Sequence, residues 1–366
     1  MQVGRERTLP LEALHTSLGA RFGEFAGWRM PLWFGGALQE HLAVRRAAGV
    51  FDISHMGRFR VRGRDAGALL SSVFSRDATL LALGASVYTL ACNDTGGIID
   101  DLLLYRTAEE SFVVICNAAN AGHIAAFLYG AAQAGREAAI EDLQLDTVFL
   151  AIQGPQAAER AGRALSAELL SVPRHGCREV AAGGQVYFCG RTGYTGEDGF
   201  EVMAPVAPGG DLFRRLIESE SCTPCGLAAR DSLRLEAALP LHGADIDEST
   251  SPWEAGLGWA VELDHDFVGR EALEATKGSG TRRLACIVSD GAGVFRHGQP
   301  VYDGDVLLGA LSSGGFSPML NRGIALAYLP RSLAREGTAL AVDVRGRRVT
   351  CHVVKRPFYS SPKVAE

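Results

Sequence analysis

The chain has 366 residues, of which 47% are hydrophobic and 21% are charged, so it can bury a core, and its length predicts two or three compact units. A net charge of −6 argues against nucleic acid as a partner. No run approaches the roughly 20 apolar residues of a membrane span, and the start MQVGRERTLP lacks the apolar segment of a signal peptide, so we expect a cytoplasmic protein without a membrane partner.

The first half of the chain predicts a helix and then a compact mixed unit. Residues 38–48 have helical spacing of apolar side chains, and Gly49 is a stop signal. From 51 to 142 the pattern is strand, helix, three strands, helix and strand. Residues 86–92 and 98–105 form a predicted hairpin around Asn-Asp-Thr-Gly-Gly. This order is typical of a split βαβ, ferredoxin-like unit.

The second half changes character near residue 283. Before it, strands alternate with helices, and the predicted helices span 156–170, 211–218 and 227–238. After it, only short alternating strands follow, at 284–288, 306–311, 339–344 and 349–354. Such strands predict a small antiparallel barrel or sandwich. We therefore expect an α+β fold with three units.

The eight cysteines predict no disulfide framework and no zinc site. Cys222 and Cys225 form one C-x-x-C pair, but no second pair follows at metal-ligand spacing. Others, such as Cys92 and Cys116, lie in apolar runs and are expected to be small buried hydrophobic residues. The nine histidines show no paired metal-ligand spacing either, so we expect no metal.

Two adjacent carboxylates, Asp100 and Asp101, follow the Gly-Gly turn of the predicted hairpin. Neighbours in a strand point to opposite faces, so one of the two carboxylates should face inward. A buried carboxylate is costly unless it is paired or used in chemistry. The alternative is that one of them bonds the backbone of the turn.

Two further segments carry polar groups that could bind a ligand. In RTGYTGEDGFE (191–201), Tyr194 offers a flat face and Glu201 offers two acceptors beside a glycine-rich turn, although an ordinary exposed hairpin would look the same. In the predicted helix of GLAARDSLRLE (226–236), Arg230 and Arg234 lie one turn apart and Asp231 can pair with Arg234. Surface ion pairs of this kind are common, so spacing alone indicates an amphipathic helix.

Dinucleotide, α/β-hydrolase and zinc-protease motifs are missing from the chain. Trp28 and Trp33 could form a stacking platform for a ring, or could simply pack in the core.

In order, nine segments of the chain resemble the T-protein (aminomethyltransferase) family of the glycine cleavage system. They span about 350 residues, and the matching segments are 25–36, 44–57, 88–102, 113–120, 152–157, 191–201, 225–237, 266–273 and 314–329. Each is weak alone, but their order is not a chance result.

The resemblance implies a three-domain cloverleaf around a channel that holds tetrahydrofolate. Its domains would be a discontinuous folate-binding α+β unit (1–50 with 143–250), a ferredoxin-like unit (51–142) and a C-terminal β-barrel (280–366). The implied reaction moves the one-carbon unit from the aminomethyl-lipoyl arm of H-protein to tetrahydrofolate, forming 5,10-methylenetetrahydrofolate and ammonia. The expected partner is therefore lipoylated H-protein, and we expect a monomer.

The resemblance also implies a set of site residues. The essential carboxylate would be Asp101, facing the reacting nitrogens, while Asp100 faces away. The residues implied to line the folate pocket are Met56, Tyr88, Asp101, Asn117, Tyr194, Glu201 and Arg230. Glu201 is expected at the pterin edge, and Arg230 is expected close to Asp101, where it would keep that carboxylate ionised.

One departure and two alternatives remain. Where relatives carry a pocket tyrosine, this chain has Arg174 or His175, so no residue is assigned there. A folate-dependent demethylase of the same superfamily would use the same aspartate. A non-catalytic folate-binding relative would carry a Lys-Gly-Cys-Tyr-x-Gly-Gln-Glu motif, which is absent from this sequence.

Overall fold

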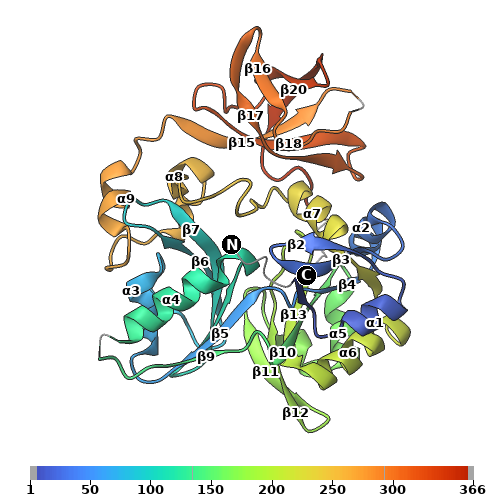
Figure 1. Cartoon of the computed structure of the whole chain (residues 1–366), viewed down its shortest axis with the longest axis vertical. Coiled ribbons are helices and arrows are strands. Elements are labelled where there is room, and N and C mark those ends of the chain that lie inside the picture. Colours follow the sequence, from blue (N-terminus) through green and yellow to red (C-terminus); the bar gives the residue numbers. More distant parts are fainter. Residues whose placement is uncertain (1–5, 134, 292, 362–366) are drawn as a thin grey trace.

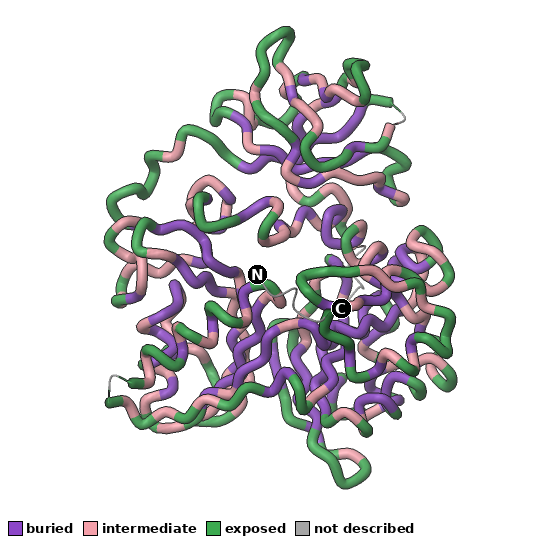
Figure 2. Tube along the Cα trace, viewed as in Figure 1, coloured by how far each residue is buried: buried purple, intermediate pink, exposed green. Residues whose placement is uncertain are grey.

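Three lobes surround a common centre in the computed structural model, which describes residues 6–133, 135–291 and 293–361 (Figure 1). A β-barrel forms one lobe at the top of the view, and two sheet-based lobes lie side by side beneath it. Purple buried segments run through each lobe separately (Figure 2). This arrangement is the three-domain α+β cloverleaf expected from the sequence.

The first lobe is a six-stranded sheet that is assembled from both halves of the chain. Its order is β11-β12-β13-β10-β4-β14. The strands are β4 (Gly49–Asp52), β10 (Thr147–Gln153), β11 (Cys177–Ala182), β12 (Gln185–Gly190), β13 (Gly199–Pro205) and β14 (Thr223–Cys225). Because β10 pairs with both β4 and β13, residues before and after the second lobe share one sheet.

Alternation along β10 gives this sheet two buried faces. Val148, Leu150 and Ile152 pack with α5 (Ala157–Ala164) and α6 (Val206–Glu218). Phe149 and Ala151 point to the opposite side, where α2 (Ala37–Arg46) and α7 (Leu227–Glu236) lie. The helix α7 therefore joins the first lobe, and it also packs against β17 and β18 of the barrel.

A small three-stranded sheet of order β1-β3-β2 completes the first lobe. It consists of β1 (Arg7–Thr8), β2 (Arg21–Phe25) and β3 (Trp28–Trp33), with α1 (Glu12–Ser17) between the first two. The sequence analysis did not predict these strands. They are short, and β3 contains Pro31, which weakens the pattern of a strand.

The second lobe has the ferredoxin-like order of elements with one additional edge strand. Its strands are β5 (Gly57–Arg62), β6 (Ser86–Cys92), β7 (Ile98–Ala108), β8 (Ser111–Cys116) and β9 (Ala139–Asp142), and its helices are α3 (Ala66–Val73) and α4 (Ala121–Ala132). The sheet order β6-β7-β8-β5-β9 is antiparallel throughout. Thus β5-α3-β7 and β8-α4-β9 form two split βαβ units. The additional edge strand is β6, which forms a hairpin with β7.

The C-terminal lobe is a closed six-stranded antiparallel barrel. Of the two architectures predicted from the sequence, the barrel is confirmed and the sandwich is not. Its order is β15-β18-β17-β16-β19-β20. The strands are β15 (Arg282–Ser289), β16 (Pro300–Asp303), β17 (Val306–Ser317), β18 (Arg322–Pro330), β19 (Ala339–Val344) and β20 (Arg347–Val354). The sequence predicted four of them. It missed the short β16, and it missed β18 because this strand is buried on both faces and lacks a polar alternation.

Short helices connect the second lobe to the barrel. They are α8 (Pro252–Ala255) and α9 (Arg270–Thr276), together with the 3-10 helix η4 (Gly258–Ala260). The part of the chain that the structure describes contains three further 3-10 helices: η1 (Ala78–Leu80), η2 (Ala118–Asn120) and η3 (Ala167–Ser171). Among the described residues, none of the helices has the length and apolar character needed to cross a membrane.

Two predicted helices differ in their bounds. The helix predicted at 156–170 is split, because α5 ends at Ala164 and the Ser166 hydroxyl accepts a bond from the Glu168 backbone to begin η3. The helix predicted from 211 begins earlier, at Val206, and it packs so closely that a Cβ on Gly209 would approach Val148 to 2.8 Å. The domain bounds 1–50 with 143–250, 51–142 and 280–366 stay a proposal, and their residues 1–5, 134, 292 and 362–366 lie outside the described part.

Candidate functional site

A cavity of about 450 Å³ lies where the three lobes meet. The first lobe contributes Met56, just beyond β4, and Arg230 on α7, while the second contributes Asn117 at the end of β8. The barrel contributes Ser313 on β17. Its walls are mainly apolar, and the aromatic side chains Phe25, Trp33 and Tyr194 are among them. A flat, ring-containing ligand of ordinary metabolite size fits such a site.

Asp101 on β7 lies one hydrogen bond behind this wall. Its Oδ2 accepts from the Tyr88 hydroxyl at 2.9 Å, and its Oδ1 accepts from the Asn117 amide at 2.9 Å. Burial raises the pKa of Asp101, while the bonds from Tyr88 and Asn117 lower it, and the net shift is upward. The two direct donors are neutral groups, so no cation among the described residues neutralises this carboxylate by contact.

Asp100 is fully buried and is held by three N–H donors. Its Oδ1 accepts from the amides of Asn117 and Asn120, both at 2.7 Å, and its Oδ2 accepts from the Asn117 backbone at 3.0 Å. Burial and the neighbouring Asp101 raise the pKa of Asp100 to about 8. The two carboxylates share the Asn117 amide, which sits beyond the end of β8 and can reach both.

The Tyr88 side chain, on β6, is held through both its hydroxyl and its ring. Its hydroxyl donates to Asp101, and its ring stacks on Trp259 with centroids 5.1 Å apart and planes at 27°. Burial and the charge of Asp101 raise the Tyr88 pKa well above its ordinary value. The tyrosine therefore remains a neutral donor to the carboxylate.

Arg230 does not contact Asp101, which differs from the sequence-based expectation. Its guanidinium lies over the Tyr194 ring at 4.9 Å, and its Nη2 is 4.0 Å from the Met56 sulfur. Within the described residues, Nη1 has no hydrogen-bond partner and no carboxylate lies at ion-pair distance. Burial lowers the pKa of Arg230, and the charge of Glu201 opposes that shift. A ligand anion or carbonyl would satisfy the free donor.

Glu201 and Tyr194 lie on the first-lobe side of the cavity. The Oε2 atom of Glu201 accepts from Thr192 at 2.7 Å and from the Tyr105 hydroxyl at 3.3 Å, which leaves Oε1 without a protein donor among the described residues. The Tyr194 hydroxyl donates to the Pro240 carbonyl at 2.5 Å, so its ring is held in the cavity wall.

Four of the seven residues expected at the folate pocket line the cavity: Met56, Asn117, Tyr194 and Arg230. Three stand behind the lining. Tyr88 and Asp101 connect to it through Asn117, and Glu201 acts on Arg230 through its charge. The structure thus gathers all seven in one region of the molecule.

Trp28 and Trp33 lie in different environments. Trp28 is 2% exposed and packs in a small core with Leu9 and Met30, whereas Trp33 is 39% exposed and lines the cavity. Arg174 and His175 do not line it, and Arg174 instead lies 3.6 Å from Asp198.

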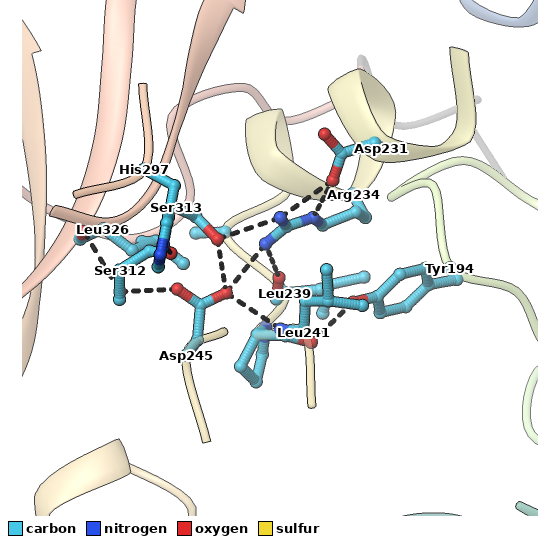
Figure 3. Close-up of polar contacts among 12 residues, drawn as sticks. Tyr194, Asp231, Arg234, Leu239, Leu241, Asp245, His297, Ser312, Ser313 and Leu326 are labelled. Carbon is cyan, nitrogen blue, oxygen red and sulfur yellow. Dashed lines mark hydrogen bonds and ion pairs between the residues drawn. The ribbon is translucent and has the colours of Figure 1, made fainter. Parts of the chain in front are cut away.

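Sequence reasoning missed the polar cluster that joins α7 to the barrel (Figure 3). Arg234 pairs with Asp245 at 2.8 Å and with Asp231 at 2.8 Å, and it donates to Ser313 at 2.9 Å. Asp245 also accepts from Ser312 and Ser313. Only the pairing of Asp231 with Arg234 was visible in the helical spacing, because Asp245 and the serines come from distant segments.

Two histidines of the cavity wall were also missed. His55 is buried, and burial together with the charge of Arg230 lowers its pKa to about 3, so it is neutral. His242 lies in the loop after α7, with Nδ1 3.1 Å from the Asn120 amide. No local pattern marks either one as a site residue. All eight cysteines are free and buried, and no cluster of potential metal ligands occurs among the described residues.

Family comparisons match nearly the whole chain. A family model described as "GCVT N-terminal domain" covers residues 11–265, and one described as "Glycine cleavage T-protein C-terminal barrel domain" covers 282–360. An aminomethyltransferase of Synechococcus elongatus is 45% identical over 96% of this chain and 95% of its own length. Another, from Saccharopolyspora erythraea, is 42% identical over 96% and 98%.

A solved structure agrees with these matches. The crystal structure of glycine cleavage system aminomethyltransferase T from Bartonella henselae is 38% identical, covers 97% of this chain and 99% of its own, and superposes with a TM-score of 0.90. The fold and cavity define a three-domain protein with a ligand site at the junction of its lobes. The chain belongs to the glycine cleavage T-protein family.

Proposed function

We propose that the chain is the aminomethyltransferase of a glycine cleavage system, with tetrahydrofolate as the one-carbon acceptor. The observation that carries this proposal is Asp101, a carboxylate whose hydrogen-bond donors in the described part of the chain are neutral, beside a three-lobe cavity. Family membership over nearly the full chain supports the same reaction.

The proposed reaction breaks two bonds to one carbon and forms two. The bonds from that carbon to the lipoyl sulfur and to its amine break, and bonds to two nitrogens of the folate form. Those nitrogens together lose two protons, while the sulfur and the leaving ammonia each gain one. The folate supplies the two accepting nitrogens, and the protein must hold them close to a carbon that becomes positively charged.

Asp101 suits that task in its ionised form. A fixed carboxylate in a site that excludes water stabilises positive charge developing on the transferred carbon. The two donors from Tyr88 and Asn117 orient it before the substrate arrives. Positioning contributes as well, because holding both reactants in one cavity replaces a bimolecular encounter.

The remaining residues fit a folate by their chemistry. Tyr194 and Trp33 offer ring faces. Glu201 stands behind the lining with Oε2 already bonded, and we propose its Oε1 as the acceptor for the amino-substituted edge of a pterin that reaches past the lining. Arg230 offers an unpartnered N–H to a carbonyl or carboxylate. In this proposal Arg230 binds the ligand and does not set the ionisation of Asp101, which corrects the role inferred from the sequence.

Lipoylated H-protein is the proposed donor. The cytoplasmic location and the monomeric state stay predictions. The demethylase and the non-catalytic folate-binding protein are not favoured, because the family models and the aminomethyltransferase relatives cover both the folate lobes and the barrel.

A single-turnover assay tests the function. The protein is mixed with aminomethyl-loaded H-protein, and ammonia is followed with and without tetrahydrofolate. We expect release that depends on the folate, with methylenetetrahydrofolate formed in equal amount. Tight folate binding without turnover on this carrier would refute the proposed donor, and a small methyl donor would then be the next substrate to assay.

A further inference from the structure

His242 occupies a fixed position between the barrel linker and the second lobe. Its Nε2 is 3.3 Å from the Ile98 carbonyl at the start of β7, and its Nδ1 is 3.1 Å from the Asn120 amide nitrogen. The surrounding loop is pressed against β7 as well, since a Cβ on Gly97 would come within 1.8 Å of the Glu248 carbonyl oxygen. The ring also lines the cavity.

Two asparagine amides connect this ring to Asp101. The Asn120 amide donates to His242 and to Asp100 Oδ1, the latter at 2.7 Å. The Asn117 amide donates to the same Asp100 oxygen at 2.7 Å and to Asp101 Oδ1 at 2.9 Å. An amide nitrogen has two hydrogens, and here both nitrogens use them in this chain of contacts.

The direction of these bonds fixes the form of the ring. Because the Asn120 nitrogen can only donate, Nδ1 must be the unprotonated nitrogen, and the proton of the neutral ring is on Nε2, facing the Ile98 carbonyl. With Asp100 ionised, turning the Asn120 amide around would place its oxygen against a carboxylate oxygen, so the relay belongs to the ionised form of Asp100. Protonation of Nδ1 would set N–H against N–H and break the contact.

We infer that His242 is a positioning residue, whose unprotonated Nδ1 orients Asp101 through Asn120, Asp100 and Asn117. This inference rests on the proposed function and adds a part to the same site. His242 need not touch the substrate, since it acts by fixing the amide that fixes the carboxylate pair. Acid would disable the relay by protonating the ring.

The charged groups around His242 are mostly acidic. Asp101 on β7 and Asp247 on its own loop lie near the ring, and Asp100 shares the Asn120 amide with it. Arg230 and Arg234 on α7 line the same cavity. A comparison of variants that change only the ring separates its effect from theirs.

Two amide variants each imitate one of the two ring nitrogens of His242. His242→Asn places an oxygen near Nδ1, so it keeps an acceptor for Asn120 but cannot be protonated in this pH range. His242→Gln places its amide near Nε2, so it can keep the Ile98 contact but loses the acceptor. We expect kcat within about threefold of wild type for His242→Asn and a fall of about 10- to 100-fold for His242→Gln, with the KM for tetrahydrofolate unchanged in both.

The pH profile provides a readout that a purely structural role would not change. On acidification, kcat of the wild type should fall more steeply than kcat of His242→Asn, because only the wild type has a ring whose protonation breaks the contact with Asn120. Equal kcat for both variants and the wild type would overturn the inference. The inference would also be overturned if His242→Gln retained kcat and His242→Asn lost it, because the Ile98 contact would then be the one that matters.

Further measurements keep the test decisive if either variant folds poorly. Asn120→Leu should lower kcat as much as His242→Gln, and the double variant should lose no more than either one. In ¹⁵N-histidine spectra of the wild type, the resonance that vanishes in His242→Asn should show an unprotonated Nδ1; a protonated Nδ1 would refute the relay. This spectrum needs no turnover, so it stays informative if the wild type releases no folate-dependent ammonia, which would refute the proposed function instead.

Discussion

Buried acidic groups in two regions of this molecule are compensated in opposite ways. At Asp100 and Asp101 the contacts come from asparagine amides, a tyrosine hydroxyl and a backbone N–H. At Glu236, between α7 and the barrel, they come from Arg45, His41 and Ser317. Both regions are buried, so burial alone does not separate them.

The pKa shifts follow from this difference. Burial raises the pKa of Glu236, but hydrogen bonds from His41 and Ser317 and the charge of Arg45 reverse the effect, and the net shift is downward. At Asp100 and Asp101 the neutral donors do not reverse it, and both are shifted upward. A carboxylate that no cation neutralises remains available to stabilise charge on a substrate, whereas a paired one only holds the lobes together.

The largest expected effect is the loss of the unpaired charge. Asp101→Asn should lower turnover by about 10²- to 10⁴-fold, since the neutral amide cannot stabilise positive charge on the transferred carbon. Folate affinity should remain within a few-fold, because the aromatic walls and Arg230 are untouched. Single-turnover ammonia release and folate titration measure the two quantities, and near-normal turnover would remove Asp101 from the mechanism.

Altering the region around Glu236, where a cation pairs with the acidic groups, should lower stability rather than turnover. Arg45 bonds Glu236 at 3.0 Å and Glu197 at 2.8 Å with its side chain fully buried. Arg45→Met removes the cation that Glu197 and Glu236 share, so the free energy of unfolding should fall by about 3–5 kcal/mol. Urea denaturation followed by circular dichroism measures it.

Arg163→Met is the matched control for this prediction. Arg163 pairs with Glu220 at 2.7 Å on the surface, and the loss there should stay below about 1 kcal/mol. Similar losses for the two variants would show that burial of the Arg45 pairs does not matter for stability.

Local patterns predicted the parts of the site that are local. The hairpin of β6 and β7 followed from its Gly-Gly turn, and Asp101 followed from the family motif around it. The convergence of Trp33, His242 and Ser313 could not be predicted, because these residues are far apart in sequence and meet only when three lobes pack together. The contacts of Arg230 with Tyr194 and Met56 could not be predicted either, because helical spacing does not say which lobe a side chain will face.

The alternation rule for strands was incomplete for a similar reason. It predicts that Asp100 and Asp101 point to opposite faces, but it does not predict that they share one donor. Asn117 lies just beyond the end of β8, and this position allows its amide to bond both carboxylates. Such a bridge depends on where the neighbouring strand ends, which sequence patterns place only to within a few residues.

An intermediate effect is expected from removing one neutral donor. The Tyr88 hydroxyl stabilises the ionised form of Asp101, so Tyr88→Phe should raise the pKa of that carboxyl further. Turnover requires the ionised form and falls as pH decreases, so the acid limb of the kcat profile should move to higher pH by about one unit. The rate at high pH should stay within a few-fold. A limb that does not move would mean that another group controls the profile.

The smallest effect is expected where a pair is exposed and its cation has other partners. The side chain of Asp231 is 57% exposed, and it bonds an Arg234 that also holds Asp245, Ser313 and the Leu239 carbonyl. Asp231→Asn should therefore lower the free energy of unfolding by less than about 1 kcal/mol and leave folate affinity unchanged. Urea denaturation and folate titration, run beside Arg45→Met, give the comparison. A loss as large as that of Arg45→Met would show that the cluster on α7 depends on its exposed member, and that exposure does not separate strong pairs from weak ones in this protein.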